Sequence, residues 1–195
     1  MKKLLKAIAH GASLAIAFFP ALLSAFGRVE TMFTFFAQTF AAAPGIPGDY
    51  LRIAWYKLTL DECSLDSRIQ FGSFFAHARA RIGRGVYIGS YCILGQTTIG
   101  DRTQIASGVQ ILSGRRQHAR DHDGRILGSH RGDFQAVAIG ADCWIGAAAI
   151  VMAEVGAGCT VGAGSVVVQP VPAHSVAVGN PAQVVKAAEP ERESR

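Results

Sequence analysis

The chain lacks the residue patterns that mark zinc-finger and nucleic-acid-binding modules. Its four cysteines have neither CxxC spacing nor a paired histidine at zinc-finger distance, which excludes a zinc finger. The formal net charge is +5, but no basic stripe interleaved with aromatic residues is present, so no nucleic-acid partner is expected. Only 17% of the residues are charged and 22 of 195 are glycine, which excludes an ordinary helical globule. An anionic small molecule or a membrane surface is the better expectation for a partner.

The N-terminus is strongly apolar. No charged residue occurs from Ala7 to Gly27, a stretch of 21 residues, and a helix needs about 20 to cross a bilayer. A second uncharged stretch runs from Thr31 to Gly48 but is broken by Pro44. Three lysines at the start favour a cytoplasmic N-terminus. We expect residues 1–48 to form an apolar helical segment that contacts membrane lipid, followed by an amphipathic connector over residues 49–64.

Several arrangements of this segment fit the sequence. A single crossing would place the rest of the chain outside the cytoplasm, whereas two crossings or a hairpin that turns near Gly27 would keep it inside. A cleaved signal peptide is a third possibility, and a helix pair that packs between subunits is a fourth. If the segment is an anchor, deletion of residues 1–47 is expected to give a soluble protein.

A six-residue repeat dominates the remainder of the chain. Aliphatic residues recur every six positions at Ile82, Ile88 and Leu94, and again in later groups of three. Many are followed by glycine or alanine, and a slender residue follows four positions later, as at Val86, Cys92, Thr98 and Cys143. A period of six fits neither a helix nor simple strand alternation. It predicts a parallel β-helix in which one aliphatic per hexad points inward, and it makes three of the four cysteines (Cys92, Cys143 and Cys159) small corner residues.

The end of the repeat resembles a known family. The motifs "IGADCWIGAAAIVM", "VGAGSVV" and "VPAHSVAVGNPA" are similar to the final coils of the hexapeptide-repeat acyltransferases, in the acetyl-CoA-dependent O-acetyltransferase branch of the surface-polysaccharide or colanic-acid type. The resemblance implies an all-β fold, a left-handed parallel β-helix over residues 65–182, assembled as a homotrimer. Residues 183–195 would form a C-terminal tail, and the four-residue step from Val151 to Val155 leaves the coil register open there.

One polar segment interrupts the repeat. Residues 114–134 contain five arginines, three aspartates and three of the six histidines, and a coil cannot absorb them, so we expect an extruded loop. In the family such a loop carries the general base, which the resemblance places at His118, with His122 as reserve. Asp121 or Asp123 would orient the imidazole or hold the acceptor, or would simply balance the arginines.

The resemblance also implies where the donor binds. Acetyl-CoA would lie along the coils against Gly146, Ala147 and Ala163, with Trp144 as a wall of the cleft, and Lys186 or Arg115 and Arg116 would meet its phosphates. For Asn180 and Pro181 a turn that ends the last coil is the preferred interpretation.

The predicted function is transfer of acetyl from acetyl-CoA to a sugar hydroxyl of a lipid-linked glycan or surface-polysaccharide precursor, at the cytoplasmic face of a bacterial inner membrane. No metal is expected. One alternative is a zinc enzyme of the carbonic-anhydrase-like β-helix branch, with His118, His122 and His130 as ligands. Another is a non-catalytic, membrane-anchored trimeric scaffold.

Overall fold

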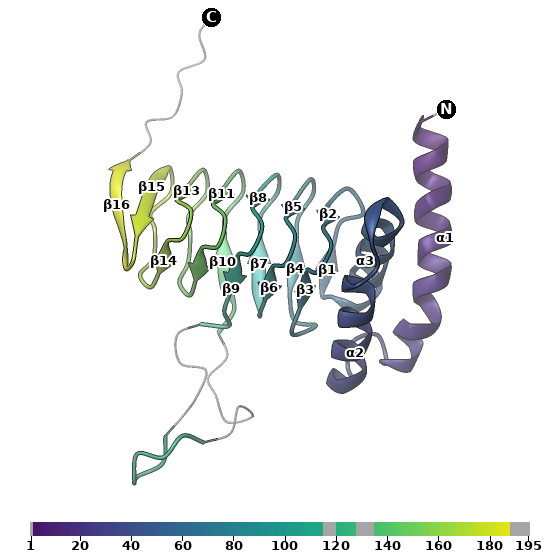
Figure 1. The fold of residues 1–195 in the computed structure, drawn as a ribbon, viewed down its shortest axis with the longest axis horizontal. Coiled ribbons are helices and arrows are strands. Elements are labelled where there is room, and N and C mark those ends of the chain that lie inside the picture. The colour runs from purple at the N-terminus through teal and green to yellow at the C-terminus, as the bar shows by residue number, and fades with distance from the viewer. Residues whose placement is uncertain (1, 115–119, 128–134, 188–195) are drawn as a thin grey trace, which may run out of the picture.

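The computed structural model describes residues 2–114, 120–127 and 135–187. Three helices precede a parallel β-helix whose coils stack along one axis (Figure 1). The helices are α1 (Lys2–Leu23), α2 (Glu30–Ala41) and α3 (Gly45–Thr59). The predicted parallel β-helix with an apolar N-terminal helical segment is therefore confirmed.

The coils form three sheets, one on each side of a prism. The first sheet contains β1 (Glu62–Cys63), β4 (Arg81–Ile82), β7 (Thr97–Ile99) and β10 (Val137–Ile139). The second contains β2 (Arg68–Ile69), β5 (Tyr87–Ile88), β8 (Gln104–Ile105), β11 (Trp144–Ile145), β13 (Thr160–Val161), β15 (Ser175–Gly179) and β16 (Ala182–Ala187). The third contains β3 (Phe74–Phe75), β6 (Ile93–Leu94), β9 (Gln110–Ile111), β12 (Ile150–Val151) and β14 (Val166–Val167).

The inward residues of the hexads stack on one another from coil to coil. Parallel pairing places Ile82 beside Ile99 in the first sheet and Ile88 beside Ile105 in the second, and all four side chains are buried. In the third sheet Leu94 pairs with Ile111. These rows form the core, because each buried aliphatic contacts the equivalent residue of the next coil.

The slender position is buried as predicted, with one correction. Val86, Cys92 and Cys143 are buried beside the inward rows, but Thr98 is exposed and its neighbour Thr97 is buried instead. The prediction at Thr98 is wrong because the step from Leu94 to the next aliphatic is five residues rather than six. Thr97 Oγ1 donates a 2.7 Å hydrogen bond to the carbonyl oxygen of Val137 in the next coil.

One edge of the prism absorbs all variation in coil length. Steps from the first sheet to the second, and from the second to the third, are six residues throughout. Steps from the third sheet back to the first vary, and we call this the variable edge. Its steps run from Phe75 to Ile82, Leu94 to Ile99, Ile111 to Ile139, Val151 to Val155 and Val167 to Val171. The four-residue step at Val151 is thus an ordinary turn of the variable edge, which resolves the register that the sequence left open.

The helices α2 and α3 close the N-terminal end of the prism. Phe33 and Phe40 of α2 are buried against Trp55 of α3, with ring centroids 5.8 and 5.6 Å from its ring. Arg52 of α3 is fully buried and donates to the carbonyl oxygens of Ala43 and Ile69. The expected connector 49–64 therefore docks on the first coil, but its helix begins at Gly45 and its last residues already belong to β1.

Helix α1 lies outermost and crosses the end of the coil stack (Figure 1). It packs against α3 through small residues, with Ser13, Ala17 and Ala21 buried. Among the described residues α1 is the one helix whose length and composition would allow it to cross a membrane, a test that core helices and signal sequences also pass.

The C-terminal end of the prism closes with a hairpin. The antiparallel strands β15 and β16 turn at Asn180 and Pro181, which confirms the predicted turn. The expected tail over residues 183–195 therefore begins within a strand, since β16 continues to Ala187.

Candidate functional site

A groove lies at the base of the extruded segment, along the variable edge. Its volume is about 460 Å³, and its walls come from three successive coils. The lining residues are Gly114, Gln135, Ala136, Val137, Ala138, Met152, Ala153, Glu154, Val168 and Pro170. Because the groove runs across successive coils, it suits an elongated molecule.

The two stems of the extruded segment meet at this groove. Gly114 has a left-handed backbone, with φ of 82°, which glycine adopts without strain. The backbone nitrogen of Gln135 donates a 3.2 Å hydrogen bond to the carbonyl oxygen of Ser113, so the returning chain rejoins the prism beside its point of exit. The predicted loop, residues 114–134, lies between Ser113 and Gln135 in the sequence, and most of it is outside the described residues.

The predicted base, His118, lies outside the described residues, as do Arg115, Arg116 and His130. The described middle of the loop, residues 120–127, forms a tight turn. Asp121 Oδ1 accepts hydrogen bonds from the backbone nitrogens of Asp123 and Arg125, both at 2.9 Å, so this oxygen holds the turn together.

The reserve base has a carboxylate partner. His122 Nε2 lies 3.3 Å from Asp123 Oδ1, and the histidine side chain is 89% exposed. A carboxylate in contact with one imidazole nitrogen can fix the tautomer and leave the other nitrogen to accept a proton. The pair is solvated, however, so its geometry is weakly constrained.

The predicted donor residues divide into two groups. Gly146, Ala147 and Ala163 lie together at the edge between the second and third sheets, where the Gly164 nitrogen donates to the Ala147 carbonyl at 2.8 Å. A Cβ at Gly146 would lie 2.5 Å from the backbone nitrogen of Ala163, so close stacking of coils already requires glycine there. Close packing of the coils therefore explains the glycine at position 146 without a bound acetyl-CoA.

Trp144 and Lys186 share one row of the second sheet. Pairing runs from Trp144 to Thr160, from Thr160 to Val176 and from Val176 to Lys186. Both end residues are exposed. This row is a different side of the prism from the groove, so one protomer does not bring Trp144 and Lys186 onto the groove walls.

Sequence reasoning missed a second cavity farther along the variable edge. It has a volume of about 630 Å³ and lies between the α1–α2 turn and the first coils. His77 Nδ1 lies 2.8 Å from Glu30 Oε1 there, and Arg28 and Arg79 line the same cavity. The partners are 47 residues apart, and no local pattern signals their contact.

No group of three potential metal ligands occurs within the described ranges. Two of the three histidines of the zinc hypothesis, His118 and His130, fall outside those ranges.

Comparisons with known proteins identify the repeat. Residues 79–113 match the family model "Bacterial transferase hexapeptide (six repeats)", and residues 136–169 match "Hexapeptide repeat of succinyl-transferase". Serine acetyltransferase 4 of Arabidopsis thaliana is 32% identical over 116 residues, which cover 56% of this chain and 28% of the relative. The chain thus spans less than a third of that protein's length.

Solved structures share the fold. A hexapeptide-repeat-containing acetyltransferase from Vibrio cholerae superposes with a TM-score of 0.68 at 21% identity, covering 87% of this chain and 94% of that one. A maltose O-acetyltransferase from Clostridium difficile gives 0.68 at 24% identity, with 87% and 89% covered. An N-acyltransferase from Bacillus cereus, solved with a sugar nucleotide and Coenzyme A, gives 0.51 at 19% identity, with 69% and 88% covered. The chain therefore contains two matches to hexapeptide-repeat models and shares its fold with these acyltransferases.

Proposed function

We propose that the protein is an acetyl-CoA-dependent O-acetyltransferase that acts on a sugar hydroxyl. The observation that carries this proposal is the position of the groove, which lies at the base of the extruded, histidine-containing segment and is lined by residues of successive coils. Acetyltransferases and a Coenzyme A-binding acyltransferase have the same fold.

The reaction requires one base. A sugar hydroxyl is a poor nucleophile at neutral pH, and a neutral imidazole can take its proton as the oxygen attacks the thioester carbonyl carbon. The tetrahedral intermediate then expels the sulfur, and the imidazolium returns its proton to the thiolate. The products are the acetyl ester and free Coenzyme A. We assign the base to His118, with the His122–Asp123 pair as the alternative.

A donor site that joins the groove to the Trp144–Lys186 row requires more than one protomer. Because the groove and the Trp144–Lys186 row lie on different sides of one prism, a donor that touches both must bridge two protomers. A trimer of prisms brings such sides together, so we propose a homotrimer with the donor bound between subunits.

The acceptor is proposed to be a lipid-linked glycan or a surface-polysaccharide precursor. The apolar outer surface of α1 supports attachment to a membrane. Acetyl-CoA is a cytoplasmic metabolite, so the β-helix is proposed to lie at the cytoplasmic face of the inner membrane, with α1 holding it near the acceptor.

A thiol-release assay tests the activity. Purified protein is incubated with acetyl-CoA and a panel of mono- and oligosaccharides, and free Coenzyme A is measured. Acceptor-dependent release is expected, and mass spectrometry should show an added acetyl group on the sugar. A serine acceptor belongs in the panel, since a relative in the comparisons is a serine acetyltransferase. Release with serine alone would overturn the sugar acceptor, and no release with any acceptor would favour the scaffold.

A further inference from the structure

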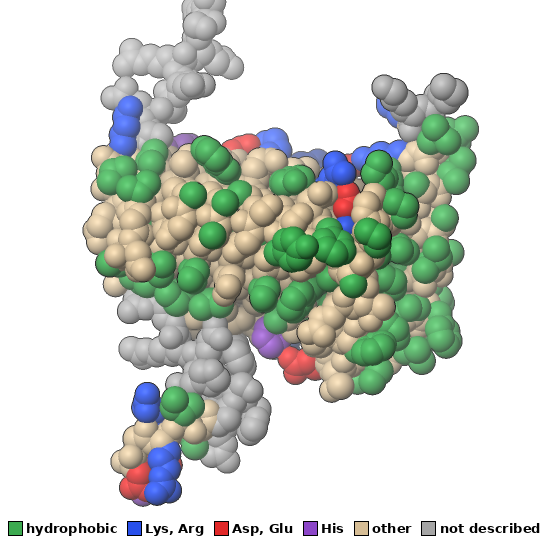
Figure 2. All heavy atoms as spheres, viewed as in Figure 1, with side chains coloured by type: hydrophobic (Ala, Val, Ile, Leu, Met, Phe, Trp, Pro, Cys, Tyr) green, Lys and Arg blue, Asp and Glu red, His purple; other side chains and the backbone are tan. Residues whose placement is uncertain are grey.

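The outer surface of α1 has large apolar side chains where a soluble helix would have polar ones. Eight large apolar residues of this helix are 49–66% exposed: Leu4, Leu5, Ile8, Ile16, Phe18, Phe19, Leu22 and Leu23. Figure 2 shows hydrophobic side chains, in green, gathered on the side of the molecule that α1 forms. The buried side of the same helix is built from small residues, the inverse of an amphipathic core helix. An apolar surface of this extent marks an interaction site.

The charges of α1 suit an anionic lipid surface. No acidic residue occurs in α1, and Lys3 and Lys6 lie in its first turns. Because α3 packs along one side of α1, lipid cannot surround the helix. This arrangement is that of a helix lying in the interface plane, with basic residues at headgroup level.

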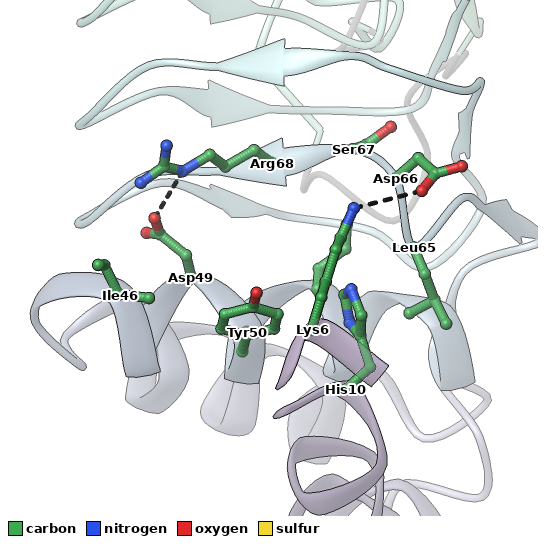
Figure 3. A pocket seen from close by; sticks show the side chains of 10 residues that line it. Lys6, His10, Ile46, Asp49, Tyr50, Leu65, Asp66, Ser67 and Arg68 are labelled. Carbon is green, nitrogen blue, oxygen red and sulfur yellow. Dashed lines mark hydrogen bonds and ion pairs between the residues drawn. The ribbon is translucent and has the colours of Figure 1, made fainter. Parts of the chain in front are cut away.

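A cavity of about 280 Å³ opens beside the basic end of this surface (Figure 3). It lies where α1, α3 and the first coil meet. Lys6 and His10 extend into it from α1, Tyr50 lines it from α3, and Arg68 borders it from β2. None of these residues belongs to the groove at the variable edge.

His10 is the residue that indicates a ligand. Both ring nitrogens are buried and have no hydrogen-bond partner among the described residues, while the ring packs edge-on against Tyr50 with centroids 4.8 Å apart. A buried donor left without an acceptor is costly, so native proteins rarely retain one without a bound water, ion or ligand. Burial and the nearby Lys6 lower the pKa of this imidazole, and Asp66 opposes them. A phosphate oxygen would accept a hydrogen bond from the ring N–H. Its negative charge would also oppose the lowering of the imidazole pKa.

Arg68 presents a prepared phosphate ligand. Its Nε donates to Asp49 Oδ2 at 2.8 Å, which fixes the plane of the guanidinium. Asp49 also accepts from Arg52 at 2.6 Å and from Gln70 at 2.9 Å, so its charge is already compensated. The terminal amino groups of Arg68 have no bond in the described part of the chain. Guanidinium groups bind phosphate through such paired N–H groups.

The remaining carboxylate is a weak competitor. Asp66 lies 3.4 Å from Lys6, and its side chain is 71% exposed. An exposed pair of this length contributes little to stability. A phosphate could therefore take over the Lys6 ammonium at small cost.

We propose that this cavity binds the phosphate of an anionic membrane lipid while the outer surface of α1 rests on the bilayer. The proposal rests on the membrane attachment proposed above and adds a lipid-selective site to it. Lys6 and His10 of α1 and Arg68 of β2 would supply the hydrogen-bond donors for this phosphate.

Vesicle co-sedimentation of the full chain tests the site. Vesicles of phosphatidylcholine alone are compared with vesicles that also contain phosphatidylglycerol. The variant Lys6→Gln/Arg68→Gln removes two positive charges from the cavity. The control Lys3→Gln/Arg81→Gln also removes one charge from α1 and one from an early coil, but both of its positions lie outside the cavity. Long-range attraction to an anionic surface falls similarly in both variants. Only the cavity variant also loses charge-assisted hydrogen bonds to a bound phosphate. The affinity of the cavity variant for the mixed vesicles should therefore be at least about tenfold lower than the affinity of the control variant.

The outcomes separate the site from the attachment. Equal affinities of the two variants would overturn the phosphate site and leave the attachment intact, whereas absence of wild-type binding to every vesicle would overturn both. Binding of glycerol 3-phosphate or inorganic phosphate as tightly as the vesicle lipid would overturn the assignment to a lipid. Arg68→Lys, which keeps the charge but not the paired N–H groups, should fall between wild type and the double variant. Coenzyme A affinity should be unchanged in all variants, so a failure of the acetyltransferase proposal is measured independently.

Discussion

Arg52 Nη2 donates a 2.6 Å hydrogen bond to Asp49 Oδ1, one turn earlier on α3, and this ion pair is the polar centre of the N-terminal cap. The Arg52 side chain is fully buried, and its other nitrogens bind the carbonyl oxygens of Ile69, Ala43 and Phe40. Burial lowers the pKa of the guanidinium, and Asp49 opposes the shift. One side chain thus joins the end of α2, helix α3 and the first coil.

Removal of this guanidinium should destabilise the cap. Arg52→Met removes a donor from the carbonyl oxygens of Ile69, Ala43 and Phe40 and the donor to Asp49 Oδ1. Loss of one partner of a buried ion pair costs about 3–5 kcal/mol. Urea denaturation followed by circular dichroism measures the free energy of unfolding. Arg81→Met is the control, because Arg81 is exposed and 4.0 Å from Glu62, and a change within about 0.5 kcal/mol is expected there. Equal effects of the two substitutions would contradict the role given to Arg52.

Gly146 should prove structurally necessary. In Gly146→Ala the new methyl group meets the backbone of the next coil, 2.5 Å from the Ala163 nitrogen, and overpacking of this kind costs about 1–3 kcal/mol. A lower midpoint of thermal unfolding is the expected result. Gly11→Ala is the matched control, because nothing lies within 4 Å of its added Cβ. Unchanged stability with weaker Coenzyme A binding would instead indicate that glycine serves the donor alone.

The four cysteines should be unreactive in the folded protein. All are free and buried. Burial raises the pKa of Cys63 to about 12 and raises the pKa of Cys92 and Cys143. Since the thiolate is the reactive form, a chromogenic disulfide reagent should label almost none of them before denaturation and all four after it. Rapid labelling of the native protein would show that the coils open. The expected result also makes the thiol-release assay free of background from the protein.

The loop histidine can be tested by substitution. His118→Ala should lower kcat by at least about 100-fold with little change in unfolding midpoint, because general-base catalysis typically contributes about 10²–10⁴-fold. His174→Asn is the control, because His174 is exposed in the turn before β15 and has φ of 57°, a conformation that asparagine tolerates. Loss of activity in His122→Ala but not in His118→Ala would transfer the role to the His122–Asp123 pair.

Membrane attachment should depend on the outer surface of α1. Ile16→Gln/Phe19→Gln replaces two exposed apolar side chains and should move the chain from the membrane fraction to the soluble fraction. Deletion of residues 1–47, the test that the sequence suggests, is unsuitable because it also removes Phe33 and Phe40 from the core. A wild-type chain found only in the soluble fraction would contradict the attachment.

The coils could be predicted from sequence because their signal is local and repeated. Each hexad specifies one inward position, as at Ile82, Ile88 and Leu94. Parallel pairing then places the inward residues of the next coil beside them. The six-residue count predicts Thr98 as the slender residue, but a single five-residue step shifts that position to Thr97. Counting along the chain detects such a step but does not show which edge of the prism absorbs it.

The cap and the cavities could not be predicted in the same way. Arg52 occupies the polar face of an amphipathic pattern, and its burial depends on carbonyl groups of distant segments that leave no trace in composition. The contact of His77 with Glu30 and the approach of Arg68 to Asp49 likewise join residues far apart in sequence. Only the fold brings these charges together.

The position of α1 across the end of the coils also sets the distance between a bilayer and the groove at the base of the loop. From β1 to β10 the first sheet advances three strand spacings, about 14 Å at roughly 4.8 Å each. The helices α3 and α1 lie beyond β1 (Figure 1), and each helix layer adds about 8–10 Å. A bilayer in contact with α1 would therefore lie roughly 30 Å from the stems of the loop. At that height the sugar nearest the lipid is out of reach, so the modified hydroxyl would belong to an outer unit of an extended saccharide.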